Sequence, residues 1–339
     1  IGKVEGSSKY GYAIKPQFNN TNIAVNRLLK DKAKIFAATE KFVDGKANFQ
    51  PGTILLPAVK NISTIEKLAK DLHLTIHALQ QPLPKTKKKL SPVRVGLYKP
   101  WRASMDEGWT RLLLERFEFN LVSVTNEMIK EGNLKKYFDA LIIPDVGKST
   151  ILNPKPKDPK RAKYYRPFPD KYEGGIGKEG VKALKAFVKK GGTLITLDSG
   201  CQLAIDEFAI PVSNALENVS RSEFRAPGVM LKNRIDTNHP IGWGMPEIFA
   251  AFVSSSPAFR TSTPMVGTDR TVVATYPDEE LLLSGWIHGE KLLRKKVSIV
   301  DVKYGEGKII LLGFRVQHRA QPHGTFKILF NSIAYAGMQ

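Results

Sequence analysis

The chain has one cysteine among its 339 residues, Cys201. A single cysteine excludes an internal disulfide framework, and it excludes a zinc cage built from cysteines, since such sites need several. The six histidines form no H-E-x-x-H or H-x-x-E pattern, so no metal site is expected within this chain. No run of about 18 or more apolar residues occurs, and no membrane-spanning helix is expected.

Acidic residues are also scarce: 32 stand against 52 basic ones, which gives a net charge of +20. Such an excess attracts anionic partners, among them nucleic acid, acidic polysaccharide and phospholipid. The basic residues concentrate only at 85–89 and 154–166, which are predicted to be a solvated linker and a surface insertion. Tyr164 and Tyr165 could stack on bases, but no nucleic-acid-binding motif accompanies them. Nucleic acid is therefore not expected as a partner, and an anionic polymer of the cell envelope stays open.

Three segments follow from the pattern of short elements. Residues 1–81 predict a small mixed α/β domain, with an Asp44-Gly45 hairpin and a capping box, Ser63 to Glu66, at the start of a helix. Residues 82–92, rich in proline and lysine, predict a linker. Residues 93–339 predict a second, larger domain that carries the basic insertion at 147–173.

In this larger domain, buried strands alternate with amphipathic helices. Strands are predicted at 93–98, 121–124, 140–143, 193–197 and 308–313, and helices after 104, at 178–190 and at 325–336. Ser104 and Glu107 form a second capping box. Residues 209–300 are less regular, with strand candidates near 272–276 and 297–302. This spacing predicts a doubly wound parallel sheet with helices on both faces.

Cys201 lies just after the strand at 193–197, where the chain breaks at 198–200 and a second apolar run begins. This layout resembles class I glutamine amidotransferases, in which the catalytic cysteine occupies such an elbow and a histidine follows a late strand. The resemblance implies a flavodoxin-like fold and a catalytic pair of Cys201 with His318 or His323.

Three departures weaken that pair. The residue two after Cys201 is not glycine, and His318 is followed by Arg319 and Ala320 rather than by an acid that would orient it. The charge of Arg319 would also disfavour a protonated imidazole at His318. We therefore expect a buried, inert cysteine. A cysteine hydrolase or amidotransferase is the alternative, and it would need a lowered thiol pKa.

Two basic and aromatic loops flank the predicted sheet. Lys99, Trp101 and Arg102 follow its first strand, and Arg315 and Arg319 follow its last. Ligands bind at the carboxyl ends of strands in open α/β sheets, so these residues predict a pocket or docking rim. Packing and cation–π pairing at the sheet edge are the alternative.

Long motifs at 95–111, 172–180, 192–199 and 313–327 resemble the C-terminal region of large bacterial zinc carboxypeptidases of the carboxypeptidase A type. The resemblance implies a secreted or periplasmic protein whose zinc peptidase domain precedes Ile1. It implies that zinc and the catalytic glutamate belong to that domain, because none of its ligands has a counterpart here. We expect this chain to be a non-catalytic accessory part whose partners are that peptidase domain and a second copy of itself.

Overall fold

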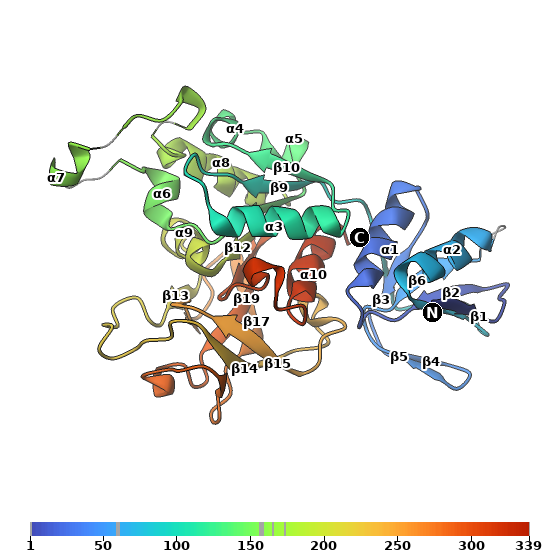
Figure 1. The fold of residues 1–339 in the computed structure, drawn as a ribbon. Coiled ribbons are helices and arrows are strands. Elements are labelled where there is room, and N and C mark those ends of the chain that lie inside the picture. Colours follow the sequence, from blue (N-terminus) through green and yellow to red (C-terminus); the bar gives the residue numbers. More distant parts are fainter. Residues whose placement is uncertain (1, 59–61, 156–158, 165, 173, 339) are drawn as a thin grey trace.

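A computed structural model describes residues 2–58, 62–155, 159–164, 166–172 and 174–338. Two units make up the chain (Figure 1). Tyr165 and parts of the predicted insertion at 147–173 lie outside the described residues. No helix in the described part of the chain is long and apolar enough to cross a bilayer.

The N-terminal unit, residues 2–89, is a six-stranded mixed sheet with two helices. Its strand order is β1-β7-β2-β6-β3-β8. The helices α1 (Asn20–Lys30) and α2 (Ser63–Leu72) turn apolar residues such as Val25, Leu28 and Leu68 into one core. The elements are β1 (Lys3–Glu5), β2 (Gly11–Ile14), β3 (Phe36–Ala38), β6 (Ile54–Pro57), β7 (Thr75–Ala78), β8 (Lys87–Lys89) and the separate hairpin β4 (Phe42–Asp44) and β5 (Ala47–Phe49).

Two expectations for this unit are wrong. The predicted linker at 82–92 contains β8, which pairs antiparallel with β3 at the sheet edge. An edge strand tolerates lysines because alternate side chains reach water, and Lys87 Nζ lies 5.6 Å from the Phe36 ring centroid. The capping box at Ser63 is not formed, since α2 begins at Ser63 and its N-cap is Ile62, without a side-chain hydrogen bond. The Asp44-Gly45 hairpin is confirmed.

The C-terminal unit, residues 93–338, is built on a twelve-stranded sheet. Its parallel half has the order β10-β9-β11-β12-β20. Counted along the chain this is 2-1-3-4-5, the flavodoxin-like order. The strands are β9 (Val95–Tyr98), β10 (Leu121–Val124), β11 (Ala140–Ile143), β12 (Thr193–Leu197) and β20 (Gly307–Leu312).

Helices cover both faces of the parallel half. On one face α3 (Met105–Arg116) and α10 (Phe326–Ala336) bury Leu113, Leu114 and Phe330 against the strands. On the other face α4 (Asn126–Glu131), α5 (Leu134–Tyr137), α8 (Gly177–Lys189) and α9 (Cys201–Glu207) form a second core. The capping box at Ser104 is confirmed in part, since its side chain accepts from Glu107 N at 3.2 Å. The insertion carries α6 (Lys148–Leu152), α7 (Pro159–Ala162) and the 3-10 turn η1 (Asp170–Tyr172).

An antiparallel extension was not expected in this sheet. Strands β19, β17, β14 and β15 continue it beyond β20 in that order. Residues 209–300 therefore hold far more strand than their irregular pattern suggested. The physical reason is visible in β17, whose register shifts twice against β19 and so breaks the alternation of apolar residues. The strands are β13 (Val212–Asn214), β14 (Val229–Ile235), β15 (Ile248–Val253), β16 (Phe259–Thr261), β17 (Thr268–Thr275), β18 (Leu282–Ser284) and β19 (Val297–Tyr304).

The two units are tied together at several places. Trp243, which follows the turn η3 (Pro240–Gly242) of the C-terminal unit, is only 5% exposed and packs in the core of the N-terminal unit. Asn26 Nδ2 donates to Phe117 O at 2.7 Å, and Leu90 forms a β-bridge with Met338. These contacts fix how one unit sits on the other (Figure 1).

Candidate functional site

The elbow after β12 is made by Asp198, not by Cys201. β12 ends at Leu197, and Asp198 then adopts a left-handed backbone with φ +48°. Residues Asp198–Gly200 form the 3-10 turn η2, and Cys201 is the first residue of α9. The prediction that places Cys201 at the elbow is therefore wrong by three residues. The strand ends at Leu197 as predicted, and the turn that follows it carries the Cys201 thiol into the core.

Cys201 is fully buried against the sheet. Its Sγ lies 3.4 Å from Thr196 O and 3.5 Å from Leu312 O, and Thr196 Oγ1 donates to it at 3.3 Å. Burial raises the pKa of this thiol far above its ordinary value, because a thiolate there would lose its hydration. The expected burial of Cys201 is confirmed, and its low reactivity stays a prediction.

Neither candidate histidine contacts Cys201 in the part of the chain that the structure describes. The His318 ring stacks on Phe252 with centroids 3.9 Å apart. Burial and the neighbouring charges of Arg315 and Arg319 lower the pKa of His318. His323 packs on Phe326, 4.9 Å between ring centroids. The structure therefore does not bring together the pair predicted from the amidotransferase resemblance.

A cluster of carboxylates around one arginine occupies this edge of the sheet instead. Arg315 donates from Nε to Asp145 Oδ2 at 2.6 Å, and the same Nε lies 3.7 Å from Asp106 Oδ1. Asp145 Oδ1 accepts from Ser199 N at 3.2 Å and also from the Ser199 hydroxyl. We call Asp106, Asp145, Asp198 and Arg315 the elbow cluster.

Asp198 is the most buried member of the elbow cluster, at 2% exposure. Burial raises the pKa of Asp198, the charge of Asp145 raises it further, and the Ser256 hydroxyl that donates to Asp198 works in the opposite direction. Burial likewise raises the pKa of Asp106. Burial thus favours the uncharged form of Asp198, which lies beside the ion pair of Asp145 with Arg315.

Of the elbow cluster, Arg315 was predicted from the sequence and the three aspartates were not. Asp145 and Asp198 both come shortly after a buried strand, at 140–143 and 193–197. Polar residues at the carboxyl ends of neighbouring parallel strands meet at one edge. The two aspartates that follow these strands could therefore have been predicted as a site from the sequence. The single cysteine nearby drew the prediction to itself instead.

The five residues of the predicted rim do not form one surface. They are Lys99, Trp101, Arg102, Arg315 and Arg319. Trp101 packs on Tyr172, with ring centroids 5.2 Å apart, and the Arg102 guanidinium lies 5.6 Å from the centroid of Phe168. Arg315 points inward to the elbow cluster, whereas Lys99 and Arg319 are exposed. Among the described residues, no hydrogen bond or ion pair joins the side chains of Lys99, Trp101 or Arg102 to those of Arg315 or Arg319, although Arg315 lies 3.7 Å from Asp106 in α3. Arg102 therefore fits the alternative of cation–π packing.

A polar pocket of about 640 Å³ opens beside the elbow. Ser199 and Ser256, which hydrogen-bond the elbow aspartates, form part of its wall. Its charged lining residues are all basic, namely Lys148, Arg221 and Arg225. No carboxylate lines it among the described residues, although Lys148 also pairs with Asp206 outside the lining. The pocket suits an anionic or hydroxyl-rich ligand. The described residues contain no group of three or more metal-ligating side chains placed to hold an ion.

The chain is similar to several solved structures, at low sequence identity. No family model matches the chain, and no curated protein does. Similar solved structures include the cytoplasmic protein STM3548 from Salmonella typhimurium (14% identity, TM-score 0.42, covering 71% of this chain and 98% of that one). A putative GMP synthase protein from Thermoplasma acidophilum is 11% identical (TM-score 0.40, 71% and 94% covered). A glutamine amidotransferase from Thermotoga maritima is 10% identical (TM-score 0.39, 72% and 98% covered). The strand order 2-1-3-4-5 gives the C-terminal unit a flavodoxin-like, doubly wound fold, as expected.

Proposed function

We propose that this chain is a non-catalytic accessory module on an amidotransferase-like scaffold. The observation that carries the proposal is the position of Cys201, whose sulfur is buried against Thr196 and Leu312 while Asp198 occupies the elbow. Covalent catalysis needs a thiolate that a substrate can reach and a base beside it. Cys201 has neither among the described residues.

The reactivity of the thiol tests this proposal. We expect native Cys201 to react with iodoacetamide or a chromogenic disulfide at pH 8 at least about 100-fold more slowly than in 6 M guanidinium chloride, because the raised pKa and the burial both suppress attack. Mass spectrometry of the alkylated protein over time provides the measurement. The rival function, a cysteine hydrolase using Cys201 and His318, requires rapid modification of the native protein, and that result would overturn the accessory role.

For the parent protein we propose a secreted zinc carboxypeptidase-like enzyme with its peptidase domain ahead of this region. The support is the resemblance of the motifs at 95–111, 172–180, 192–199 and 313–327. In such a protein the parent reaction is removal of C-terminal amino acids by metal-activated water, and this module would cover the peptidase domain or steer peptides to it.

The intact mass of the natural product tests the parent. We expect a mass well above the 37.7 kDa of the present chain, by at least the size of one peptidase domain. A natural product of 37.7 kDa that is also encoded without any preceding domain would contradict this parent.

A second function has one observation in its favour. The pocket beside the elbow has Lys148, Arg221 and Arg225 as its charged lining, which supports binding of an anionic polymer of the cell envelope. We expect affinity for a polyuronate such as polygalacturonate to fall about tenfold or more between 50 and 200 mM salt, and Arg221→Glu with Arg225→Glu to weaken it at least tenfold. Lys67→Glu with Lys70→Glu, on exposed α2, is the charge-matched control. Equal losses in both double variants would indicate attraction to net charge alone.

A further inference from the structure

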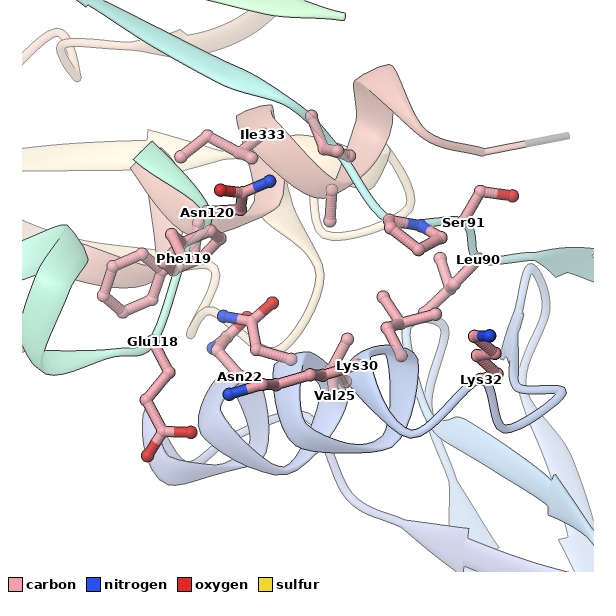
Figure 2. A pocket seen from close by; sticks show the side chains of 16 residues that line it. Asn22, Val25, Lys30, Lys32, Leu90, Ser91, Glu118, Phe119, Asn120 and Ile333 are labelled. Atoms are coloured by element: carbon pink, nitrogen blue, oxygen red, sulfur yellow. The ribbon is translucent and has the colours of Figure 1, made fainter. Parts of the chain in front are cut away.

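A second cavity, of about 730 Å³, lies between the two units. One side of it is α1, another is the connecting segment 90–93, and the third combines the turn at 118–120 with the last turns of α10 (Figure 2). None of its lining residues belongs to the elbow cluster. It is therefore a site distinct from the polar pocket beside Asp198, and a ligand bound in it is independent of the accessory role.

The cavity is held open by contacts at two of its borders. At one border Asn26 Nδ2 donates to Phe117 O at 2.7 Å. At the other, Leu90 bridges Met338 and Ser91 N donates to Gly337 O at 3.2 Å. Because hydrogen bonds between the units flank the space, it is preformed rather than an incidental gap. Preformed cavities of this size at domain boundaries are common ligand sites.

Its walls are mostly apolar. The apolar lining includes Val25 and Leu29 on α1, Leu90 and Val93 on the connecting segment, and Phe330 and Ile333 on α10. Figure 2 shows Val25 and Leu90 on one side of the space, with Ile333 and Phe119 across from them. When a hydrocarbon chain or an aromatic ring enters the cavity, its apolar surface leaves water and contacts these side chains, which favours binding.

The free charges at the cavity are cationic. Lys30 and Lys32 line it, and neither forms an ion pair among the described residues. Glu118, the acidic residue of the lining, is already bound by Arg27, whose Nε donates to both carboxylate oxygens at 3.0 and 3.1 Å and whose Nη2 donates at 2.7 Å. The lysines therefore remain available for an anionic group.

We propose that this cavity binds one small amphipathic carboxylate, with its apolar body between α1 and α10 and its carboxylate at Lys30 or Lys32. The two lysines lie at the end of α1 and just after it, and Figure 2 shows their side chains in different parts of the cavity border, so the carboxylate pairs with one of them while its tail stays in the cavity. Such a ligand contacts both units at once. Its binding stabilises their association as well as the folded chain.

Calorimetric titration of the full chain with decanoate, and with decanol as the uncharged analogue, tests the proposal. We expect saturable one-to-one binding of decanoate, weakened at least tenfold by Lys30→Glu with Lys32→Glu, while decanol binding changes less than twofold. Lys67→Glu with Lys70→Glu on α2 is the matched control and leaves both ligands unaffected. Ala334→Phe, which fills the cavity from α10, abolishes binding of both ligands while the circular dichroism spectrum stays native. Three results would overturn the proposal. The first is that decanoate does not bind saturably, and the second is that the Lys30→Glu, Lys32→Glu variant loses decanoate and decanol binding equally. The third is that decanoate still binds both this variant and Ala334→Phe.

Discussion

Arg315→Met is expected to lower the free energy of unfolding by about 3 kcal/mol. The substitution leaves Asp145 and Asp106 at the buried edge of the sheet without the guanidinium that now lies 2.6 and 3.7 Å from them. Removing one partner of a buried ion pair costs about 3 to 5 kcal/mol, because the other charge stays uncompensated. We place the expectation at the lower end, since the Arg315 side chain is 21% exposed. Urea denaturation followed by circular dichroism measures it.

Two further variants isolate the electrostatic cause. Arg319→Met changes an exposed arginine in the same loop, and we expect a loss within about 0.5 kcal/mol. The double variant Arg315→Met with Asp145→Asn removes the uncompensated charge together with its partner, and it is expected to recover at least half of the loss. If the double variant is as unstable as Arg315→Met alone, the loss comes from packing and not from the elbow cluster.

Trp243→Ala is expected to cost about 3 to 5 kcal/mol and to separate the unfolding of the two units. The indole is 5% exposed, fills the core of the N-terminal unit, and donates to Asn238 O at 3.0 Å in its own unit. Gly52 marks how closely it packs, since a Cβ there would lie 2.5 Å from the Trp243 Cβ. Large-to-small changes at such sites leave a cavity whose cost lies in this range. Because the indole links the two cores, its loss also weakens their coupling.

Calorimetry measures both effects. We expect one unfolding transition in the wild-type chain and two in the variant. Trp101→Ala, at a tryptophan that is 49% exposed in the C-terminal unit, is the control and is expected to keep a single transition. A single, merely shifted transition in Trp243→Ala would mean that the other contacts, such as Asn26 with Phe117, suffice to couple the units.

The parallel half of the sheet was predictable because its strands are continuous apolar runs separated by helices. Residues 140–143 and 193–197 are buried along their whole length, and such runs identify parallel strands without any further information. The antiparallel half was not predictable by the same route. β19 is buried along most of its length and was expected as a strand at 297–302. By contrast, β14 carries the exposed Arg234 near its end, and the register of β17 shifts twice.

At the candidate site, the region of the chain was predictable from the sequence, but the positions of the side chains were not. The sequence located the basic residue Arg315 and the break at 198–200, yet the elbow position was assigned to Cys201 and not to Asp198. A shift of three residues decides whether a side chain faces the cleft or the core, and only the backbone angles at Asp198 settle where the chain turns. Likewise, pairing β8 with β3 depends on a contact about 50 residues away along the chain, which a local lysine run cannot reveal.

The backbone bridge between Leu90 and Met338 has a consequence for how the whole molecule moves. The segment that joins the two units forms this bridge with Met338, which follows α10. The bridge restricts the motion of the segment, so it is not a flexible linker. Any body attached to the N-terminal unit is then carried at a fixed orientation to the sheet of the C-terminal unit. We expect the two units to move together as one rigid body. A flexible proline- and lysine-rich linker would instead let them rotate relative to each other.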